Sequence, residues 1–274
     1  MRGLLTTLAS GSEAAVASLG AFSPSLAQGR VLERRDHRPW PLPPGPWLMA
    51  QSWEDLLFAH WRVPEERLRS LMPPEIPLDT FDGSAWVGVT PFRVGAFRLR
   101  GMPHLPGLTA FAEVNVRTYA TIDGKPGIFF LSLDAASPLA VAGARRAYRL
   151  PYFRADMDVV RDGGWIDYRS ERVSDDGPPA RLELRYRPTG EPRTAEAGSL
   201  EYFLAERYCL YTSDNRGTPH RADIHHPPWP LRPAEAIIEL NSMATPWRLD
   251  LSSTDPLLHF AARQDVVIWP IAPV

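Results

Sequence analysis

The chain has 274 residues, of which 44% are hydrophobic, and this composition excludes a disordered chain and supports a substantial core. A formal net charge of −2 excludes the strongly basic surface of a typical nucleic-acid-binding protein. The single cysteine, Cys209, excludes an intramolecular disulfide, and no apolar run reaches the roughly 20 residues of a membrane-spanning helix. We therefore expect a cytoplasmic protein with no nucleic-acid or membrane partner.

The N-terminal region predicts an extension in front of the folded domain. We expect residues 1–37 to be poorly ordered and residues 38–274 to form a single β domain. A signal peptide stays open as an alternative, because Arg2, an Ala/Leu-rich stretch and "SLAQ" are similar to a secretory signal, although Glu13 interrupts the apolar segment. A start codon assigned too early also stays open, with Met49 or a nearby position as the natural beginning.

The first half of the chain predicts mainly extended structure. Residues 36–47 contain five prolines and two tryptophans, which exclude a helix or a central strand and predict an extended arm laid over a surface. Residues 56–63 predict a buried strand, and Pro64 followed by acidic residues predicts the first turn of a helix. Aromatic and β-branched residues then predict strands across 79–101, with a turn at an Asp-Gly pair.

The second half predicts further hairpins and two short helices. A strand ending at Ile122 meets the turn sequence "DGKPG" and pairs with a strand over 128–135. Ser137 and Pro138 are a typical N-cap and first residue for a helix over 137–148. The remaining signals are a hairpin around "RDGG", a half-exposed strand over 180–188, a short helix after Ser199 and a hairpin around "DNRG". These elements predict one mainly β (α+β) domain with a few short helices, built as an antiparallel barrel or a strongly curved sheet.

The strand over 111–121 carries polar side chains on every second residue. Glu113, Asn115, Arg117 and Tyr119 share one face, because successive side chains of a strand point to opposite sides. In a closed sheet that face points either inward, where its groups pair with one another or with a ligand, or outward into solvent. The period itself leaves this choice open.

Seven segments, taken in order, carry a family resemblance. They are "RPWPLPPGPWLMAQSWEDLLFAHWRVP", "LDTFDGSAWVGVTPFRV", "FAEVNVRTYA", "FLSLDA", "GSLEYFLAERYCLY", "IHHPPWPL" and "LLHFAARQDVVIW". Together they resemble the YqjF-like family of uncharacterised proteins, in the acetoacetate decarboxylase-like superfamily, over about residues 38–270. The resemblance implies an acetoacetate decarboxylase-like β-barrel or β-cone that encloses a cavity for a small molecule, often in homo-oligomers.

The resemblance also implies a chemistry for which this sequence lacks the residues. In the decarboxylase branch, a lysine in the cavity forms a Schiff base with a keto acid, beside a second lysine. The counterpart segment here is "GARRAYRLPYFRADM", in which Tyr152 and Phe153 follow Pro151 and neither lysine is present. The only lysine of the chain, Lys125, lies in the turn "IDGKPG", without the burial or neighbouring cation that a Schiff-base lysine needs. We therefore expect no Schiff base, and we expect neither a cofactor nor a metal.

Glu113, Arg117 and Tyr152 are the candidate catalytic residues. Arg117 would bind an anion or polarise a carbonyl and Glu113 would move a proton, as the resemblance implies for an arginine and a glutamate of the cavity. Tyr152, at the expected lysine position, would donate a hydrogen bond, and its alternative is a core tyrosine with a satisfied hydroxyl. The candidate substrate-binding residues are Asn115, Tyr119, Glu206, Arg207 and His226.

Three functions stay open. The first is a lyase-like enzyme that acts on a small carboxylate- or carbonyl-bearing molecule by lyase, aldol-dehydration or cyclisation chemistry. The second is a non-catalytic ligand-binding or sensing protein, and the third is a structural or interaction protein. An enzyme needs Glu113 with a raised pKa in a concave site, whereas a binder can have that carboxylate firmly paired. A scaffold would have a filled barrel and an exposed apolar patch elsewhere. For Glu113 and Arg117 themselves, the alternative to a functional site is a structural charge network inside the barrel.

Overall fold

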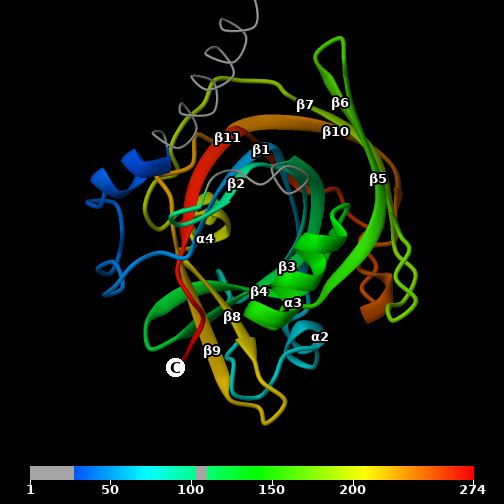
Figure 1. The fold of residues 1–274 in the computed structure, drawn as a ribbon. Helices are drawn as coiled ribbons and strands as arrows, with labels where there is room; N and C mark the ends of the chain where they lie inside the picture. Colours follow the sequence, from blue (N-terminus) through cyan, green and yellow to red (C-terminus); the bar gives the residue numbers. More distant parts are fainter. Residues whose placement is uncertain (1–27, 103–109) are drawn as a thin grey trace, which may run out of the picture.

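The computed structural model describes residues 28–102 and 110–274, and their fold is mainly β, as predicted (Figure 1). The strands are β1 (Met49–Val63), β2 (Ala85–Leu99), β3 (Ala110–Ile122), β4 (Lys125–Ala135), β5 (Tyr152–Asp162), β6 (Trp165–Arg172), β7 (Arg181–Pro188), β8 (Cys209–Ser213), β9 (Pro219–His225), β10 (Arg232–Asn241), β11 (Leu257–Ile268) and β12 (Ala272–Pro273). The helices are η1 (Val31–Glu33), α2 (Glu65–Arg69), α3 (Pro138–Tyr148), α4 (Leu200–Ala205) and η2 (Thr245–Trp247). Within the described ranges, none of the helices is long and apolar enough to cross a membrane.

The strands form a 12-stranded sheet that curls into a ring (Figure 1). Their order is β12-β9-β8-β4-β3-β2-β1-β11-β10-β7-β6-β5, and two additional pairings, β4 with β5 and β9 with β11, close the sheet on itself. The first pairing closes a ring through β5, β6, β7 and β10, and the second closes a ring through β8 and β9. Strands β1 to β4 and β11 belong to both rings.

The ring that contains β5, β6, β7 and β10 is filled by the main hydrophobic core. Val114 and Val116 of β3 belong to the same buried cluster as Tyr168 of β6 and Tyr186 of β7. These valines alternate along β3 with the polar residues of the other face. Because successive side chains of a strand point to opposite sides, burial of the valines in this core turns the polar face of β3 into the other ring.

Helix α3 begins where the sequence predicts and ends in a sharp turn. The Ser137 hydroxyl accepts a hydrogen bond from the backbone N–H of Ala140 (3.3 Å), and Pro138 is the first helical residue. The helix is followed by Arg149, whose φ of 54° lies in the left-handed region. The chain then reverses, so that Tyr152 begins β5 in parallel pairing with β4. Helix α4 begins with a serine cap of the same kind.

The proline-rich segment is an extended arm that lies on β8 and β9. Arg38 is buried, and its guanidinium donates to the carbonyl of Ile224 (2.5 Å) and pairs with the carboxylate of Asp223 (2.7 Å). The indole N–H of Trp40 donates to the same carboxylate (2.8 Å). The predicted arm is therefore anchored by a buried ion pair.

The end of the expected N-terminal extension also contacts the domain. Gln28 donates to the carbonyl of Ala96 (2.9 Å), and Val31 packs in a small buried cluster with Trp269. Residues 1–27, where a signal peptide or an early start is predicted to lie, are outside the described residues.

Candidate functional site

A cavity of about 450 Å³ lies inside the ring closed by β8 and β9. Strands β1, β2, β3 and β4 form much of its wall, and α3 contributes a row of lining residues. Most of the lining is aliphatic or aromatic, with a few polar residues, which is the usual composition of a small-molecule site. The polar lining residues are Gln51, Thr90, Glu113, Asn115, Arg117, Tyr148 and Tyr152.

The polar face of β3 points into this cavity. Glu113, Asn115 and Arg117 are each no more than 6% exposed, and all three line the cavity wall. On the neighbouring strand β2, Thr90 lies opposite Asn115, and Phe92 lies opposite Glu113. The inward orientation that the sequence left open is therefore the one that the fold adopts.

Glu113 is a buried carboxyl without a cationic partner in the described part of the chain. Its carboxyl accepts a hydrogen bond from the hydroxyl of Tyr152 (3.1 Å). Burial raises the pKa of Glu113 to about 8; the Tyr152 hydrogen bond opposes this increase, and the nearby charge of Asp134 adds to it. Glu113 therefore holds its proton at neutral pH, and it can donate that proton or lose it near pH 8.

Arg117 is a buried cation at the other end of the polar face. Its guanidinium lies over the ring of Phe58, with 5.1 Å between the central carbon and the ring centre. Among the described residues, no carboxylate lies within ion-pair distance of it. An anionic ligand group would supply the missing counter-charge.

Several buried polar atoms around Arg117 also lack a protein partner. The Nε of Arg117, the Oδ1 of Asn115 and the Oγ1 of Thr90 make no hydrogen bond within the described part of the chain. Buried polar atoms are almost always hydrogen-bonded in folded proteins. Three such atoms on adjacent β2 and β3 positions of one cavity indicate a place for water or for a polar ligand group.

Tyr152 lies at the position where the family resemblance implies a lysine. It lines the cavity, and burial together with the neighbouring Glu113 raises its pKa well above the ordinary value. Lys125 is not among the lining residues; its backbone carbonyl, at the start of β4, accepts a hydrogen bond from the hydroxyl of Tyr211 (2.7 Å). The only lysine of the chain is thus placed away from the cavity wall.

Tyr119 follows the period of the polar face but lies one step beyond the cavity. Its hydroxyl is 2.7 Å from Nε2 of His60 and donates to the carbonyl of Leu204 in α4 (3.0 Å). Along β3 the cavity lining ends at Arg117. A substrate-binding role for Tyr119 stays a prediction, with no support from this geometry.

The predicted residues around α4 and β9 form a separate buried network. Arg207 pairs with Asp79 (2.7 Å), and Glu206 accepts a hydrogen bond from the backbone N–H of Trp229 (2.8 Å). The Nε2 of His226 is 3.3 Å from the carbonyl oxygen of Arg207. None of Glu206, Arg207 and His226 belongs to the cavity lining, so their substrate-binding roles also stay predictions.

Sequence reasoning missed a buried ion pair behind Glu113. The carboxylate of Asp134 in β4 pairs with the guanidinium of Arg172 in β6 (2.7 Å), and both side chains are 0% exposed. The guanidinium also stacks on Phe153, 4.0 Å from the ring centre. The signal in the sequence was a lone acidic residue at the end of the apolar run "IFFLSLDA". In the described ranges, no group of three or more metal-ligating side chains is placed to hold a metal ion.

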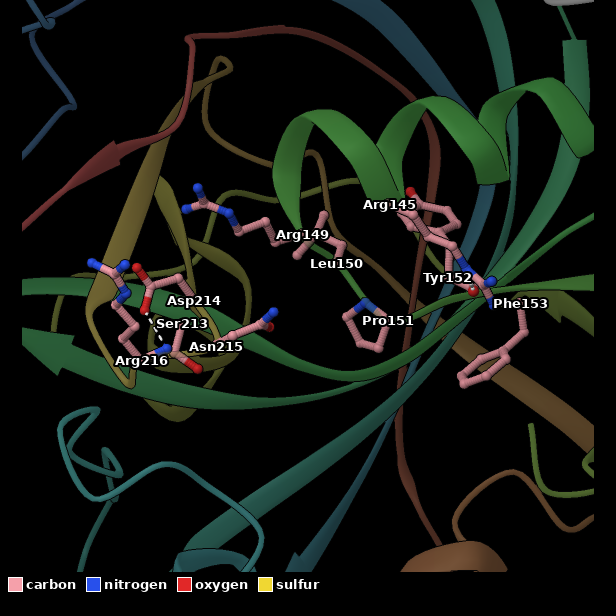
Figure 2. A pocket seen from close by; sticks show the side chains of 10 residues that line it. All are labelled: Arg145, Arg149, Leu150, Pro151, Tyr152, Phe153, Ser213, Asp214, Asn215 and Arg216. Carbon is pink, nitrogen blue, oxygen red and sulfur yellow. Dashed lines mark hydrogen bonds between the residues drawn. The ribbon is translucent and has the colours of Figure 1, made fainter. Parts of the chain in front are cut away.

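An open hollow of about 640 Å³ lies on the surface beside the cavity (Figure 2). It is lined by Arg145, Arg149, Leu150, Pro151, Tyr152, Phe153, Ser213, Asp214, Asn215 and Arg216. Two of its arginines are already engaged, because Arg145 pairs with Asp176 (2.6 Å) and Arg149 lies 2.8 Å from Nε2 of His220. Tyr152 lines both the hollow and the cavity, so the start of β5 separates the two.

The sequence of the chain matches a family of unknown function. Residues 50–265 match DUF2071, whose description is "Uncharacterized conserved protein". The uncharacterized protein YqjF of Bacillus subtilis (strain 168) is 47% identical to the chain over 241 residues, which cover 88% of this chain and 98% of that protein. Both findings agree with the resemblance seen in the sequence.

Solved structures with a similar fold include acetoacetate decarboxylases and related enzymes. Acetoacetate decarboxylase from Legionella pneumophila has a TM-score of 0.55 at 13% identity, covering 89% of this chain and 95% of that one. The enduracididine biosynthesis enzyme MppR, complexed with pyruvate, has a TM-score of 0.55 at 11% identity, with coverages of 87% and 94%. An acetoacetate decarboxylase-like enzyme from Sphingomonas wittichii RW1 has a TM-score of 0.56 at 15% identity, with coverages of 85% and 97%.

At these identities the structural likeness concerns the fold alone, and it confirms the acetoacetate decarboxylase-like fold that the sequence predicts. The match over most of the chain and the Bacillus relative establish its family. The chain belongs to the DUF2071, or YqjF-like, family of uncharacterized conserved proteins.

Proposed function

We propose that the protein binds a small molecule with a carboxylate or carbonyl group in the cavity and acts on it by proton transfer, without a lysine Schiff base. The observation that carries this proposal is the pair formed by Glu113 and Arg117. Both are buried on one face of β3, both line the same cavity, and neither has an oppositely charged partner among the described residues. Buried charged groups are normally paired, so the Arg117 charge without a counter-charge, beside a carboxyl that burial keeps protonated, favours a ligand that completes the site.

The two side chains would divide the chemistry between them. Arg117 would bind the carboxylate or polarise the carbonyl, because its planar guanidinium suits two-point binding of such groups. Glu113, with a pKa near 8, would donate its proton to a developing oxyanion or leaving group, or take a proton from the carbon next to the carbonyl once it is ionised. Tyr152, which donates to Glu113 at 3.1 Å, would hold the carboxyl in place. Aldol-dehydration reactions, and lyase or cyclisation reactions that pass through an enolate, use these steps.

The relatives support a ligand of this class. MppR, of the same fold, is described in complex with pyruvate and in complex with the condensation product of pyruvate and imidazole 4-carboxaldehyde. Pyruvate carries both a carboxylate and a carbonyl. Non-catalytic binding remains the alternative, favoured by the Tyr152 hydrogen bond to Glu113, whereas the presence of the cavity disfavours a purely structural role.

Replacing Arg117 by glutamine is expected to weaken binding of pyruvate and acetoacetate at least tenfold, because a charge-assisted hydrogen bond to a carboxylate is lost. Titration calorimetry measures this directly. Arg146→Gln, on the exposed side of α3, is the matched control and keeps the wild-type affinity. Equal affinity of wild type and Arg117→Gln would contradict the proposed anion site.

Proton transfer is tested by exchange of the pyruvate methyl protons in D₂O, followed by NMR. We expect the wild-type protein to accelerate this exchange, with a rate that rises toward pH 8 as Glu113 ionises, and Glu113→Gln to lose the acceleration. Binding without any acceleration in the wild type would support the ligand-binding alternative.

Borohydride treatment in the presence of pyruvate or acetoacetate is expected to leave the protein mass unchanged, since the only lysine is not part of the cavity wall. Mass spectrometry of the intact protein reads the outcome. A reduced adduct at Lys125 would contradict the exclusion of a Schiff base.

A further inference from the structure

We propose that the ligand is an amphipathic monoanion, such as a 2-oxo acid with an apolar tail of several carbons, and that it binds with its acid group inward and its tail toward the cavity mouth. This inference rests on the proposed anion-binding role of Arg117 and adds the substrate class. It follows from how polar and apolar residues are distributed along the cavity.

Strand β3 shows the polarity of the cavity. Its lining residues are, in order, Phe111, Glu113, Asn115 and Arg117. At about 3.3 Å per residue, the backbone positions of Phe111 and Arg117 are roughly 20 Å apart, and those of Glu113 and Arg117 roughly 13 Å apart. One end of the wall is therefore polar and the other aromatic, and a ligand that contacts both ends must be elongated.

Strand β2 repeats this order, whereas β4 lines the cavity only with the apolar residues Ile128, Phe130 and Leu133. On β2, Thr90 lies opposite Asn115 at the polar end, and the later lining residues Phe97 and Leu99 are apolar. At the start of β1, Met49 pairs with Leu99 on one side and with Ile268 of β11 on the other, and all three line the cavity. The adjacent strands β1, β2 and β3 and strand β11 thus place apolar side chains at the same end, where Gln51 of β1 is a polar neighbour.

The apolar end is also the open end. Leu48 and Leu139 line the cavity, yet they are 36% and 65% exposed to solvent, whereas Glu113 and Arg117 are 5% and 6% exposed. Large exposed aliphatic side chains at the mouth of a cavity are typical of a surface that an apolar ligand covers. A ligand that entered tail first would place its carboxylate among these leucines and its tail against Arg117, which has no carboxylate partner among the described residues, and this is unfavourable at both ends.

Helix α3 keeps space for the tail. The residues that it turns to the cavity include Ala140, Gly143, Ala144 and Ala147, all small. A Cβ atom added at Gly143 would meet no heavy atom within 4 Å. Glycine inside a helix is less favourable than alanine. The helix therefore carries a destabilising residue at a solvent-exposed position of the cavity lining, where an added side chain would meet open space.

The test is a series of straight-chain 2-oxo acids from pyruvate to 2-oxooctanoate, titrated calorimetrically into the wild-type protein at pH 7. Each added methylene is expected to lower Kd about three- to fourfold while it is buried in the apolar part of the cavity. An affinity that stays constant or falls with chain length would overturn the apolar-tail inference.

Variants of α3 locate the tail. Gly143→Leu is expected to weaken 2-oxooctanoate at least tenfold more than pyruvate, because the added side chain fills the space of the tail. Ala142→Leu, the adjacent exposed position outside the cavity lining, is the control and keeps the wild-type ratio of the two affinities. An equal effect of Gly143→Leu on both acids would contradict the inference.

Arg117→Gln separates a failure of this inference from a failure of the proposed function. If Arg117→Gln weakens all members of the series but chain length has no effect, only the tail is wrong. If chain length matters and Arg117→Gln has no effect, the anion site is wrong, and the orientation of the ligand with it. The titration of the 2-oxo acid series into the wild-type protein tests the tail inference even if a variant fails to fold.

Discussion

Replacing Glu113 by glutamine is expected to make the folded protein more stable than the wild type at pH 8.5 by as much as about 5 kcal/mol. The folded state raises the pKa of Glu113 from its usual 4.5 to about 8, so the folded protein keeps a proton that the unfolded chain releases. The wild type is therefore most stable, in this respect, below pH 4.5, and it loses about 1.4 kcal/mol per pH unit until pH 8. Glutamine does not titrate and fits the same space.

Urea unfolding at pH 4.5 and 8.5 measures this difference. Glu113→Gln and the wild type should differ little at the lower pH and most at the higher pH, because only the higher pH ionises the buried carboxyl. Glu239→Gln, at an exposed position of β10, is the matched control for the loss of one carboxylate. A difference between Glu113→Gln and wild type that is the same at both pH values would show that Glu113 is not buried as described.

A stabilising substitution at this position would itself bear on function. Groups that lower the stability of a protein persist where they carry out a task, and perturbed carboxyls concentrate at functional sites. If the Glu113→Gln variant is more stable than the wild type and inactive in proton exchange, then Glu113 is a residue retained for activity. The same result with unchanged ligand affinity would separate proton transfer from binding.

Replacing Asp134 by alanine is expected to destabilise the protein by about 3–5 kcal/mol, because the guanidinium of Arg172 is left buried without its counter-charge. Both side chains are 0% exposed, and Arg172 also donates to the carbonyl of Pro178 (3.0 Å). The double replacement Asp134→Leu with Arg172→Met should recover most of the loss, since it removes both charges and fills the space. Urea unfolding of Asp134→Leu, Arg172→Met and the double variant gives the coupling.

The exposed pair Arg145–Asp176 is the control for this cycle. Its side chains are 37% and 59% exposed, so Asp176→Ala is expected to change stability little. A single Asp134→Ala variant no less stable than Asp176→Ala would contradict the buried position of the pair. Because Asp134 also contributes to the raised pKa of Glu113, the same variant should lower the pH at which proton exchange reaches its maximum.

Local structure was predictable where single residues or pairs determine it. Ser137 and Pro138 mark the start of α3 in the sequence as they do in the fold. The turn after β3 follows from its Asp-Gly pair, in which Asp123 and Gly124 both have positive φ. Strand β10, by contrast, was not predicted, because "RPAEAIIELN" shows no clean alternation and is defined by its pairing with β7 and β11.

The sequence by itself determined that Glu113, Asn115 and Arg117 share a strand face, because the two-residue period of a strand is a local property. The family resemblance adds the expectation that Tyr152 stands where a Schiff-base lysine would lie. Only the tertiary structure decided that this face looks into a cavity. The pairings of β4 with β5 and of β9 with β11 close the two rings, and such contacts between distant segments leave no periodic trace in the chain. Tyr119 has the same two-residue spacing along β3 but does not line the cavity. The end of the cavity depends on the residues that pack against the strand from elsewhere in the chain, here His60 and α4.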